Sequence, residues 1–107
     1  MSFQQYSIVI VNLDPTVGSE IQKTRPCVII SPDEMNLHLA TVVICPVTSR
    51  SRNYPTRVTF DLDGKTNWIV VDQIRTIDKI RIIKSIGRLS PGPVSELKRI
   101  IKAAYVD

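Results

Sequence analysis

Residues 8–30 read Ile-Val-Ile-Val-Asn-Leu-Asp-Pro-Thr-Val-Gly-Ser-Glu-Ile-Gln-Lys-Thr-Arg-Pro-Cys-Val-Ile-Ile. Two apolar runs, residues 8–13 and 27–30, enclose a long polar loop at residues 14–26. Apolar, β-branched runs of this length predict buried strands, because they are too short to form independent helices. A long loop between two strands is costly to order and adds no core, and such loops commonly carry function. We therefore expect a β protein in which this loop forms one edge of a binding or catalytic site.

Four more segments have the character of strands, at residues 41–47, 57–62, 68–72 and 82–89. Asp63 and Gly64 predict a tight hairpin between the second and third of them, since both central positions of a type I′ turn need positive φ. In the last segment, Gly87 predicts a bulge or a sharp bend.

Two helices are predicted. Ser31 as a cap, followed by Pro32 and two acidic residues, indicates a short helix that ends near Leu37. A longer C-terminal helix begins at Pro93 and has one apolar face. That face consists of Val94, Leu97, Ile100, Ile101 and Ala104. Together these elements predict a mainly β fold with a C-terminal helix, in which five or six antiparallel strands close into a small, strongly curved barrel.

The composition indicates one folded domain that spans residues 1–107, with 43% hydrophobic and 22% charged residues. No apolar run approaches the roughly 20 residues that cross a membrane. Residues 1–5 are neither basic nor apolar, which argues against a signal peptide. We expect a soluble, cytoplasmic protein with no membrane partner.

The cysteines and the histidine do not suggest a metal site. Cys27 and Cys45 lie in apolar runs, where a free cysteine acts as a small buried side chain. His38 is the only histidine, and we expect it to be structural or exposed because no partner for it is visible. No cysteine pair has the spacing of zinc ligands. We therefore predict no metal and no cofactor.

Positive charge is concentrated in the later part of the chain. The formal net charge is +4, yet residues 1–22 contain no lysine or arginine. A basic surface attracts polyanions, which here means either a nucleic acid or an acidic protein segment. A merely solvated basic face is the other interpretation of the same charges.

Four segments, by their order and spacing, resemble the MazF/PemK family of toxins. They are residues 14–20 (Asp-Pro-Thr-Val-Gly-Ser-Glu), 25–26 (Arg-Pro), 46–49 (Pro-Val-Thr-Ser) and 72–78 (Asp-Gln-Ile-Arg-Thr-Ile-Asp). The resemblance implies an SH3-like barrel, a homodimer, and sequence-specific cleavage of single-stranded mRNA without a metal. It also implies a toxin that is neutralised by a cognate, MazE-like antitoxin, whose acidic C-terminal segment covers the RNA site.

The resemblance assigns catalysis to Arg25 and Thr48. Attack of a ribose 2′-hydroxyl on the adjacent phosphate builds negative charge on the non-bridging oxygens, which a guanidinium stabilises with its planar set of donors. A threonine hydroxyl can donate a further hydrogen bond and orient the phosphate. The implied products are a 2′,3′-cyclic phosphate and a 5′-hydroxyl end. A purely structural role for Thr48 at the end of a strand is the alternative.

The group that moves the proton is less clear. Arginine titrates above about 12 and is a poor general base near neutral pH. Glu20 and Asp72 are the candidate bases, although Glu20 could instead brace its loop and Asp72 could bind turn amides. In the PemK branch an aspartate at the Asp72 position is paired with an arginine two residues earlier, where this chain has Val70.

Basic and aromatic residues directly after Thr48 indicate an RNA-binding loop, since cations bind phosphates and aromatic rings stack on bases. The candidates are Ser49, Arg50, Arg52 and Tyr54, together with Lys23 on the first loop. A solvated hairpin tip is the alternative. Trp68 could also stack on a base, but at the start of an apolar strand we expect it in the core.

Two other functions remain open. One is a non-enzymatic toxin that binds DNA gyrase, as CcdB proteins do through a C-terminal tryptophan-glycine-isoleucine; this chain ends instead in Tyr105-Val106-Asp107. The other is a binding module that has kept the barrel and lost catalysis. The presence of Arg25 and Thr48 argues against it.

Overall fold

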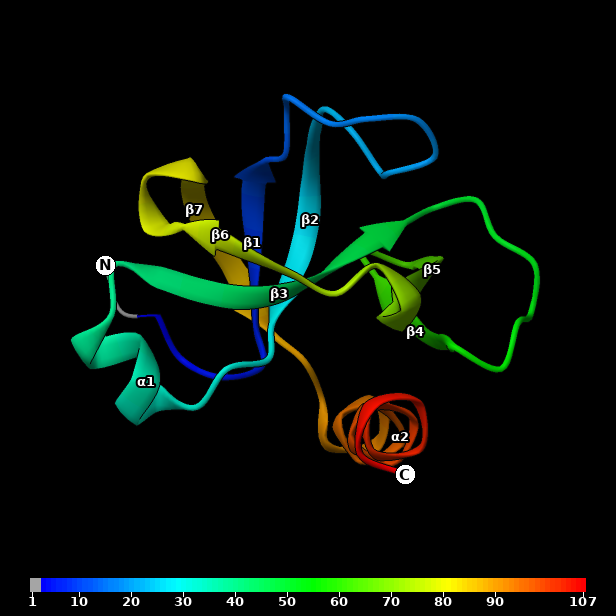
Figure 1. The fold of residues 1–107 in the computed structure, drawn as a ribbon. Coiled ribbons are helices and arrows are strands. Elements are labelled where there is room, and N and C mark those ends of the chain that lie inside the picture. The colour runs from blue at the N-terminus through cyan, green and yellow to red at the C-terminus, as the bar shows by residue number, and fades with distance from the viewer. Residues whose placement is uncertain (1–2) are drawn as a thin grey trace.

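The apolar runs of the sequence form an antiparallel sheet in the computed structural model, which describes residues 3–107 (Figure 1). Its strands are β1 (Ser7–Asn12), β2 (Thr24–Ile29), β3 (Thr41–Thr48), β4 (Arg57–Leu62), β5 (Lys65–Val70), β6 (Arg75–Asp78) and β7 (Ile82–Arg88). The helices are α1 (Asp33–His38) and α2 (Pro91–Ile101), with the 3-10 turns η1 (Val71–Gln73) and η2 (Lys79–Arg81) and a π-helical end η3 (Lys102–Val106). The predicted mainly β fold with a C-terminal helix is confirmed.

The sheet has the strand order β4-β5-β3-β2-β1-β7, and β6 pairs with β3 beside this path. On one side β3 pairs with β2, and on the other it pairs first with β6 and then with β5. The sheet therefore curls into a half-barrel, with β4 and β7 as the two ends of the strand order. The expected full closure of the barrel is not seen among the described residues, because β4 and β7 are not paired with each other.

Two apolar cores lie on opposite faces of the central strands. The inner core fills the curl of the sheet and contains Val9, Val11, Leu13, Cys27, Ile29, Val42, Ile44, Ile77 and Ile82. The helix core lies under α2 and includes Ile8, Val28, Cys45, Val47, Val58, Phe60, Ile69, Val71, Leu89, Leu97 and Ile100. Successive residues of a strand point to opposite faces, so a strand buried on both faces has a continuous apolar sequence. This explains why β1, β2 and β3 lack the alternation that β4 shows.

Several predicted details are confirmed. Asp63 and Gly64 have φ angles of 52° and 77°, as the hairpin turn requires. The pairing of β1 with β7 shifts register beside Gly87, which is the predicted bulge. Cys27 and Cys45 are free and fully buried. His38 is exposed at the end of α1.

Other details of the secondary structure differ from the prediction. The return strand is Lys65–Val70 rather than 68–72, because a two-residue turn pairs Lys65 directly with Leu62. Strand β6 was not predicted, so the sheet has seven strands instead of five or six. Helix α2 begins at Pro91, two residues earlier than expected, since proline is also well suited to the first helical turn there.

Three side chains also lie elsewhere than expected. Ser31 does not cap α1; it is buried, donates to Asn36 Oδ1 at 2.5 Å and accepts from the Val43 amide at 3.0 Å. Ala104 is exposed rather than packed, because the predicted apolar face assumes an α-helix, whereas Ala104 lies in the π-helical end η3. Trp68 is only half-buried: it faces away from the helix core, and its indole N–H donates to Asn53 Oδ1 at 3.3 Å. No helix in residues 3–107 has the length and apolarity of a membrane span.

Candidate active site

Arg25 and Thr48 occupy corresponding positions on neighbouring strands. The β2–β3 pairing ends at Cys27 and Pro46, so Arg25 and Thr48 each lie two residues beyond the last pair, at the start of β2 and the end of β3. Alternation along each strand puts both side chains on the inner-core face, beyond the apolar part of that core. Both residues are half-buried. The two predicted catalytic side chains therefore share one face of the sheet, just beyond the last β2–β3 pair.

Their hydrogen bonds connect them to the adjoining loops. Arg25 Nε donates to the carbonyl of Gln22 at 3.2 Å. Thr48 Oγ1 donates to the carbonyl of Arg50 at 3.1 Å and accepts from the Arg50 amide at 3.2 Å. Trp68 pairs with Thr48 across β3 and β5, so its ring lies on the same face. An aromatic ring therefore flanks the candidate catalytic pair.

Loop 1, residues 13–23, is tied together by its own side chains. The Lys23 amide donates to Asp14 Oδ1 at 2.9 Å, and the Leu13 amide donates to the Lys23 carbonyl at 3.0 Å. Glu20 Oε1 accepts from the Val17 amide at 2.8 Å, which is the bracing role considered for this residue. The Lys23 side chain is exposed. Loop 1 is thus an organised loop that presents Lys23 to solvent.

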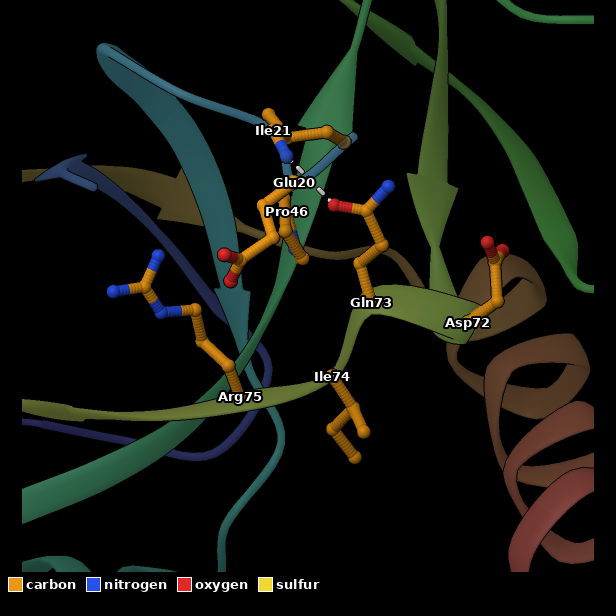
Figure 2. Close-up of a pocket in the computed structure, with 7 residues that line it drawn as sticks. All are labelled: Glu20, Ile21, Pro46, Asp72, Gln73, Ile74 and Arg75. Carbon is orange, nitrogen blue, oxygen red and sulfur yellow. Dashed lines mark hydrogen bonds between the residues drawn. The ribbon is translucent and has the colours of Figure 1, made fainter. Parts of the chain in front are cut away.

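A pocket of about 230 Å³ lies between loop 1, β3 and η1 (Figure 2). Its lining residues are Glu20, Ile21, Pro46, Asp72, Gln73, Ile74 and Arg75. Pro46 is on the same face of β3 as Thr48, although neither Thr48 nor Arg25 lines the pocket. The two candidate bases, Glu20 and Asp72, both line it. Arg75 contributes a cation and donates through Nη1 to the Leu13 carbonyl at 3.1 Å.

Asp72 is engaged by a cation that the sequence analysis did not single out. Arg57 contacts both carboxylate oxygens, with Nε–Oδ1 at 2.9 Å and Nη2–Oδ2 at 3.2 Å. The Thr56 hydroxyl donates to Oδ1 at 2.8 Å. The hydrogen bonds from Arg57 are the main cause that lowers the pKa of Asp72 below its usual value. A carboxylate with a lowered pKa and occupied oxygens is a weak proton acceptor.

Loop 2, residues 49–56, carries the remaining predicted RNA-binding side chains. Ser49, Arg50, Arg52 and Tyr54 are all exposed. Arg57 holds this loop as well: its Nη1 donates to Ser51 Oγ at 2.7 Å, and its guanidinium lies 5.0 Å from the centre of the Tyr54 ring. Loop 2 therefore exposes two arginines, Arg50 and Arg52, and the ring of Tyr54 directly after Thr48.

Arg57, Gln73 and Arg75 are site residues that the sequence analysis missed as such. Gln73 and Arg75 lie inside the segment 72–78 that carried the family resemblance, which was the available signal for them. Arg57 sits in an ordinary alternating strand and offered no signal of its own. Within residues 3–107, no three His, Cys, Asp or Glu side chains come close enough to hold a metal ion.

Comparison with known proteins places the chain in a family. Residues 4–105 match the family described as PemK-like, MazF-like toxin of type II toxin-antitoxin system. The chain belongs to the PemK/MazF family. It is 35% identical over 104 residues to the endoribonuclease MazF9 of Mycobacterium tuberculosis, covering 86% of each chain. It is 34% identical over 100 residues to the endoribonuclease MazF of Staphylococcus saprophyticus, covering 88% of this chain and 83% of that one.

Solved structures of MazF proteins share the fold. MazF of Deinococcus radiodurans superposes with a TM-score of 0.89 at 24% identity, over 100% of this chain and 99% of that one. The Mycobacterium tuberculosis toxin MazF-mt6 gives 0.79 at 26% identity, over 94% and 96% of the two chains. A mycobacterial endoribonuclease in complex with its cognate antitoxin gives 0.81 at 21% identity, over 95% and 93%. The family resemblance and the fold implied by the motifs are therefore confirmed.

Proposed function

We propose that this PemK/MazF chain is a sequence-specific, metal-independent endoribonuclease that cleaves single-stranded mRNA as the toxin of a toxin–antitoxin pair. The observation that supports the proposal is that Arg25 and Thr48 share one face of the sheet, each next to a loop with exposed cations. The relatives named as endoribonucleases support the same activity. We take residues 1–107 to act as a single domain.

In the proposed reaction, a ribose 2′-hydroxyl attacks the adjacent phosphorus in line with the departing 5′-oxygen. The P–O5′ bond breaks and the departing 5′-oxygen takes a proton from solvent, which leaves a 2′,3′-cyclic phosphate and a 5′-hydroxyl end. Arg25 stabilises the charge that builds on the non-bridging oxygens, since a guanidinium presents several donors in one plane. Thr48 donates its hydroxyl to the same phosphate, exchanging its bond to the Arg50 carbonyl for one to the substrate.

Glu20 is the better of the two candidate bases. Asp72 is paired with Arg57 and its pKa is lowered, so it holds a proton poorly at the pH of the reaction. Glu20 is exposed at the pocket and uses Oε1 to brace Val17. We assign proton abstraction to Glu20 and a positioning role to Asp72. Comparing the pH–rate profiles of Glu20→Gln and Asp72→Asn tests this. Removal of the general base abolishes the rise of the cleavage rate with increasing pH, so Glu20→Gln should lose this rise and Asp72→Asn should keep it.

RNA binding falls to the two loops. Lys23, Arg50 and Arg52 supply cations for phosphates, and Ser49 supplies a hydrogen bond. Tyr54 and the half-exposed Trp68 supply rings on which bases can stack. We propose that these groups bind the RNA on either side of the reacting phosphate.

The proposed partners follow from the family. We propose a cognate, MazE-like antitoxin whose acidic C-terminal segment covers the basic loops, a homodimer, and action in the cytoplasm. The MazF of D. radiodurans has been crystallised with MazE, and its fold matches this chain with a TM-score of 0.80 at 24% identity. A basic loop pair and an acidic segment are electrostatically complementary, and such complementarity mainly accelerates association.

The deciding experiment is cleavage of a long unstructured RNA by the wild type, Arg25→Ala and Thr48→Ala, all in EDTA. The proposal requires cutting at a short recurrent sequence, 5′-hydroxyl ends, and loss of cutting in both variants. Unchanged melting temperatures of the variants serve as the control for folding. Intact RNA, with growth still arrested in cells that express the wild type, would instead favour a protein target such as DNA gyrase.

A further inference from the structure

We propose that the 3-10 turn η1 holds both loops of the candidate site in place. Gln73 positions loop 1, and the Asp72–Arg57 pair positions loop 2. Each loop contacts the nucleotides on one side of the scissile phosphate. This inference rests on the proposed function. It assigns positioning roles to Gln73 and Arg57 and divides sequence recognition between the two loops.

Gln73 holds loop 1 with both ends of its amide, and Figure 2 shows the first of the two hydrogen bonds, to Ile21. Oε1 accepts from the Ile21 amide at 2.7 Å, and Nε2 donates to the Ser19 carbonyl at 3.3 Å. One side chain thereby satisfies a backbone donor and a backbone acceptor on either side of Glu20. Ile21 also packs against the inner core, so this part of loop 1 has a fixed place above the pocket.

The preceding residue, Asp72, holds loop 2 through Arg57. Arg57 is only 16% exposed and binds Asp72 in the two-pronged geometry that guanidinium and carboxylate favour. Its remaining contacts, to Ser51 and to the Tyr54 ring, both lie in loop 2. Thr56, the last residue of loop 2, binds the same carboxylate. Two consecutive residues of η1 thus connect to two different loops.

The 3-10 turn η1 is itself fixed to the helix core. Val71 is fully buried, and its carbonyl accepts a hydrogen bond from Tyr105 Oη at 2.7 Å. The Val71 amide donates to the Thr56 carbonyl at 3.1 Å. Because η1 is anchored by burial and by η3, it can hold the loops without moving with them.

The position of the loops explains the division of recognition. Loop 1 leads directly into the strand that carries Arg25, and loop 2 follows directly after Thr48. In Figure 1 the blue loop 1 joins the start of β2, and the green loop 2 continues from the end of β3. RNA whose phosphate is bound by Arg25 and Thr48 therefore has loop 1 next to Arg25 and loop 2 next to Thr48.

The test measures cleavage of a randomised RNA pool and steady-state kinetics on the preferred site, for the wild type, Gln73→Ala and Arg57→Ala. We expect Gln73→Ala to relax base preference on one side of the cut and Arg57→Ala on the opposite side. In each variant KM should rise about tenfold, because the loop loses a hydrogen bond that holds it in the RNA-binding position. The value of kcat should stay within about threefold of the wild type. Arg57→Lys keeps the positive charge but cannot bind both carboxylate oxygens of Asp72 in the same way. It should therefore restore only part of the base preference that Arg57→Ala loses.

Arg88→Ala is the matched control, because Arg88 is an exposed arginine of β7 whose side chain donates to Gln4 and Gln5, outside both loops. It leaves preference and KM unchanged. Relaxed preference on the same side in both loop variants would overturn the division of recognition. A fall in kcat with an unchanged KM would overturn the positioning role.

Amide hydrogen exchange separates failure of this inference from failure of the proposed function. If the wild type does not cut RNA, the proposed function is lost, but the positioning roles still predict faster exchange of loop 1 in Gln73→Ala and of loop 2 in Arg57→Ala. Each variant should leave the other loop as protected as in the wild type. Equal loosening of both loops, or of neither, contradicts the proposal that η1 holds them separately.

Discussion

The two faces of the central strands have opposite tasks. On the helix-core face, α2 covers the sheet with Leu97 and Ile100, and no polar side chain is required there. On the inner-core face, the apolar part ends before the strands do, and Arg25 and Thr48 occupy the remaining positions. One face therefore carries stability and the other carries the candidate chemistry, although both are built from the same strands. Substitutions on the two faces should separate the two properties.

The largest effect is expected on the helix-core face. Leu97 is fully buried, and Leu97→Ala should lower the free energy of unfolding by about 2–5 kcal/mol because it leaves a cavity under α2. Urea denaturation measures this, and the folded fraction should still cut RNA at the wild-type sequence. Ile80→Ala is the control, since Ile80 is 88% exposed and should change stability by less than about 0.5 kcal/mol. A stable Leu97→Ala protein with altered cleavage would break the proposed division between the faces.

The next effect is on the opposite face and concerns activity. Thr48→Val keeps the shape of the side chain and removes its hydroxyl, so kcat should fall by about 10- to 100-fold, the value of a hydrogen bond to a charged group. Chemical denaturation should show little change because Thr48 is half-exposed. Thr66→Val, at an exposed position of β5, provides the same chemical change away from the site. Equal activity of the two valine variants would remove Thr48 from the mechanism.

A smaller effect concerns the charge of loop 2. If Arg50 contacts one phosphate, Arg50→Ala should reduce the slope of log affinity against log salt by about 0.7, as expected for single-stranded nucleic acid. Binding of an uncleavable RNA analogue between about 50 and 200 mM salt measures this. Lys84→Ala removes an exposed charge from β7 and should leave the slope unchanged. A slope that responds equally to both substitutions would show a diffuse charge effect in place of a defined contact.

The smallest expected effect is on the reactivity of the two cysteines, one on each face, toward a thiol reagent. Cys27 belongs to the inner core and Cys45 to the helix core, and burial raises the pKa of each thiol to about 12. At pH 8 about one thiol in 10⁴ is ionised, so neither should react with a thiol reagent in the native protein, and any slow reaction should accelerate tenfold per pH unit. In Leu97→Ala, Cys45 should become reactive before Cys27. Simultaneous exposure of both would show that the two faces open together.

Much of the fold could be predicted from short-range patterns. The β-branched runs predicted β1, β2 and β3, and Asp63-Gly64 predicted the hairpin turn, because both depend on local backbone preferences. Strand β6 was missed because four residues with polar ends have no strong preference of their own. They become a strand only through pairing with β3.

The candidate site could be predicted only in part, for a related reason. Arg25, Thr48 and the basic residues of loop 2 were found from motifs and charge, and their roles stay predictions until cleavage is measured. Arg57 and Gln73 were missed because their partners lie far away in the sequence: Asp72 is 15 residues from Arg57, and Ile21 is 52 residues from Gln73. Trp68 was expected in the core, but alternation on β5 turns it toward Thr48.

The sequence by itself determined both helices and every strand except β6, the burial of both cysteines, the family and the candidate catalytic pair, because these follow from residue preferences, spacing and motif. Only the tertiary structure decided which side chains meet. Strand pairing puts Arg25 and Thr48 on one face of the sheet, and η1 brings Asp72 to Arg57 and Gln73 to loop 1. These contacts depend on strand register and loop path, which arise from packing of the whole chain and leave no local trace in the residues that make them.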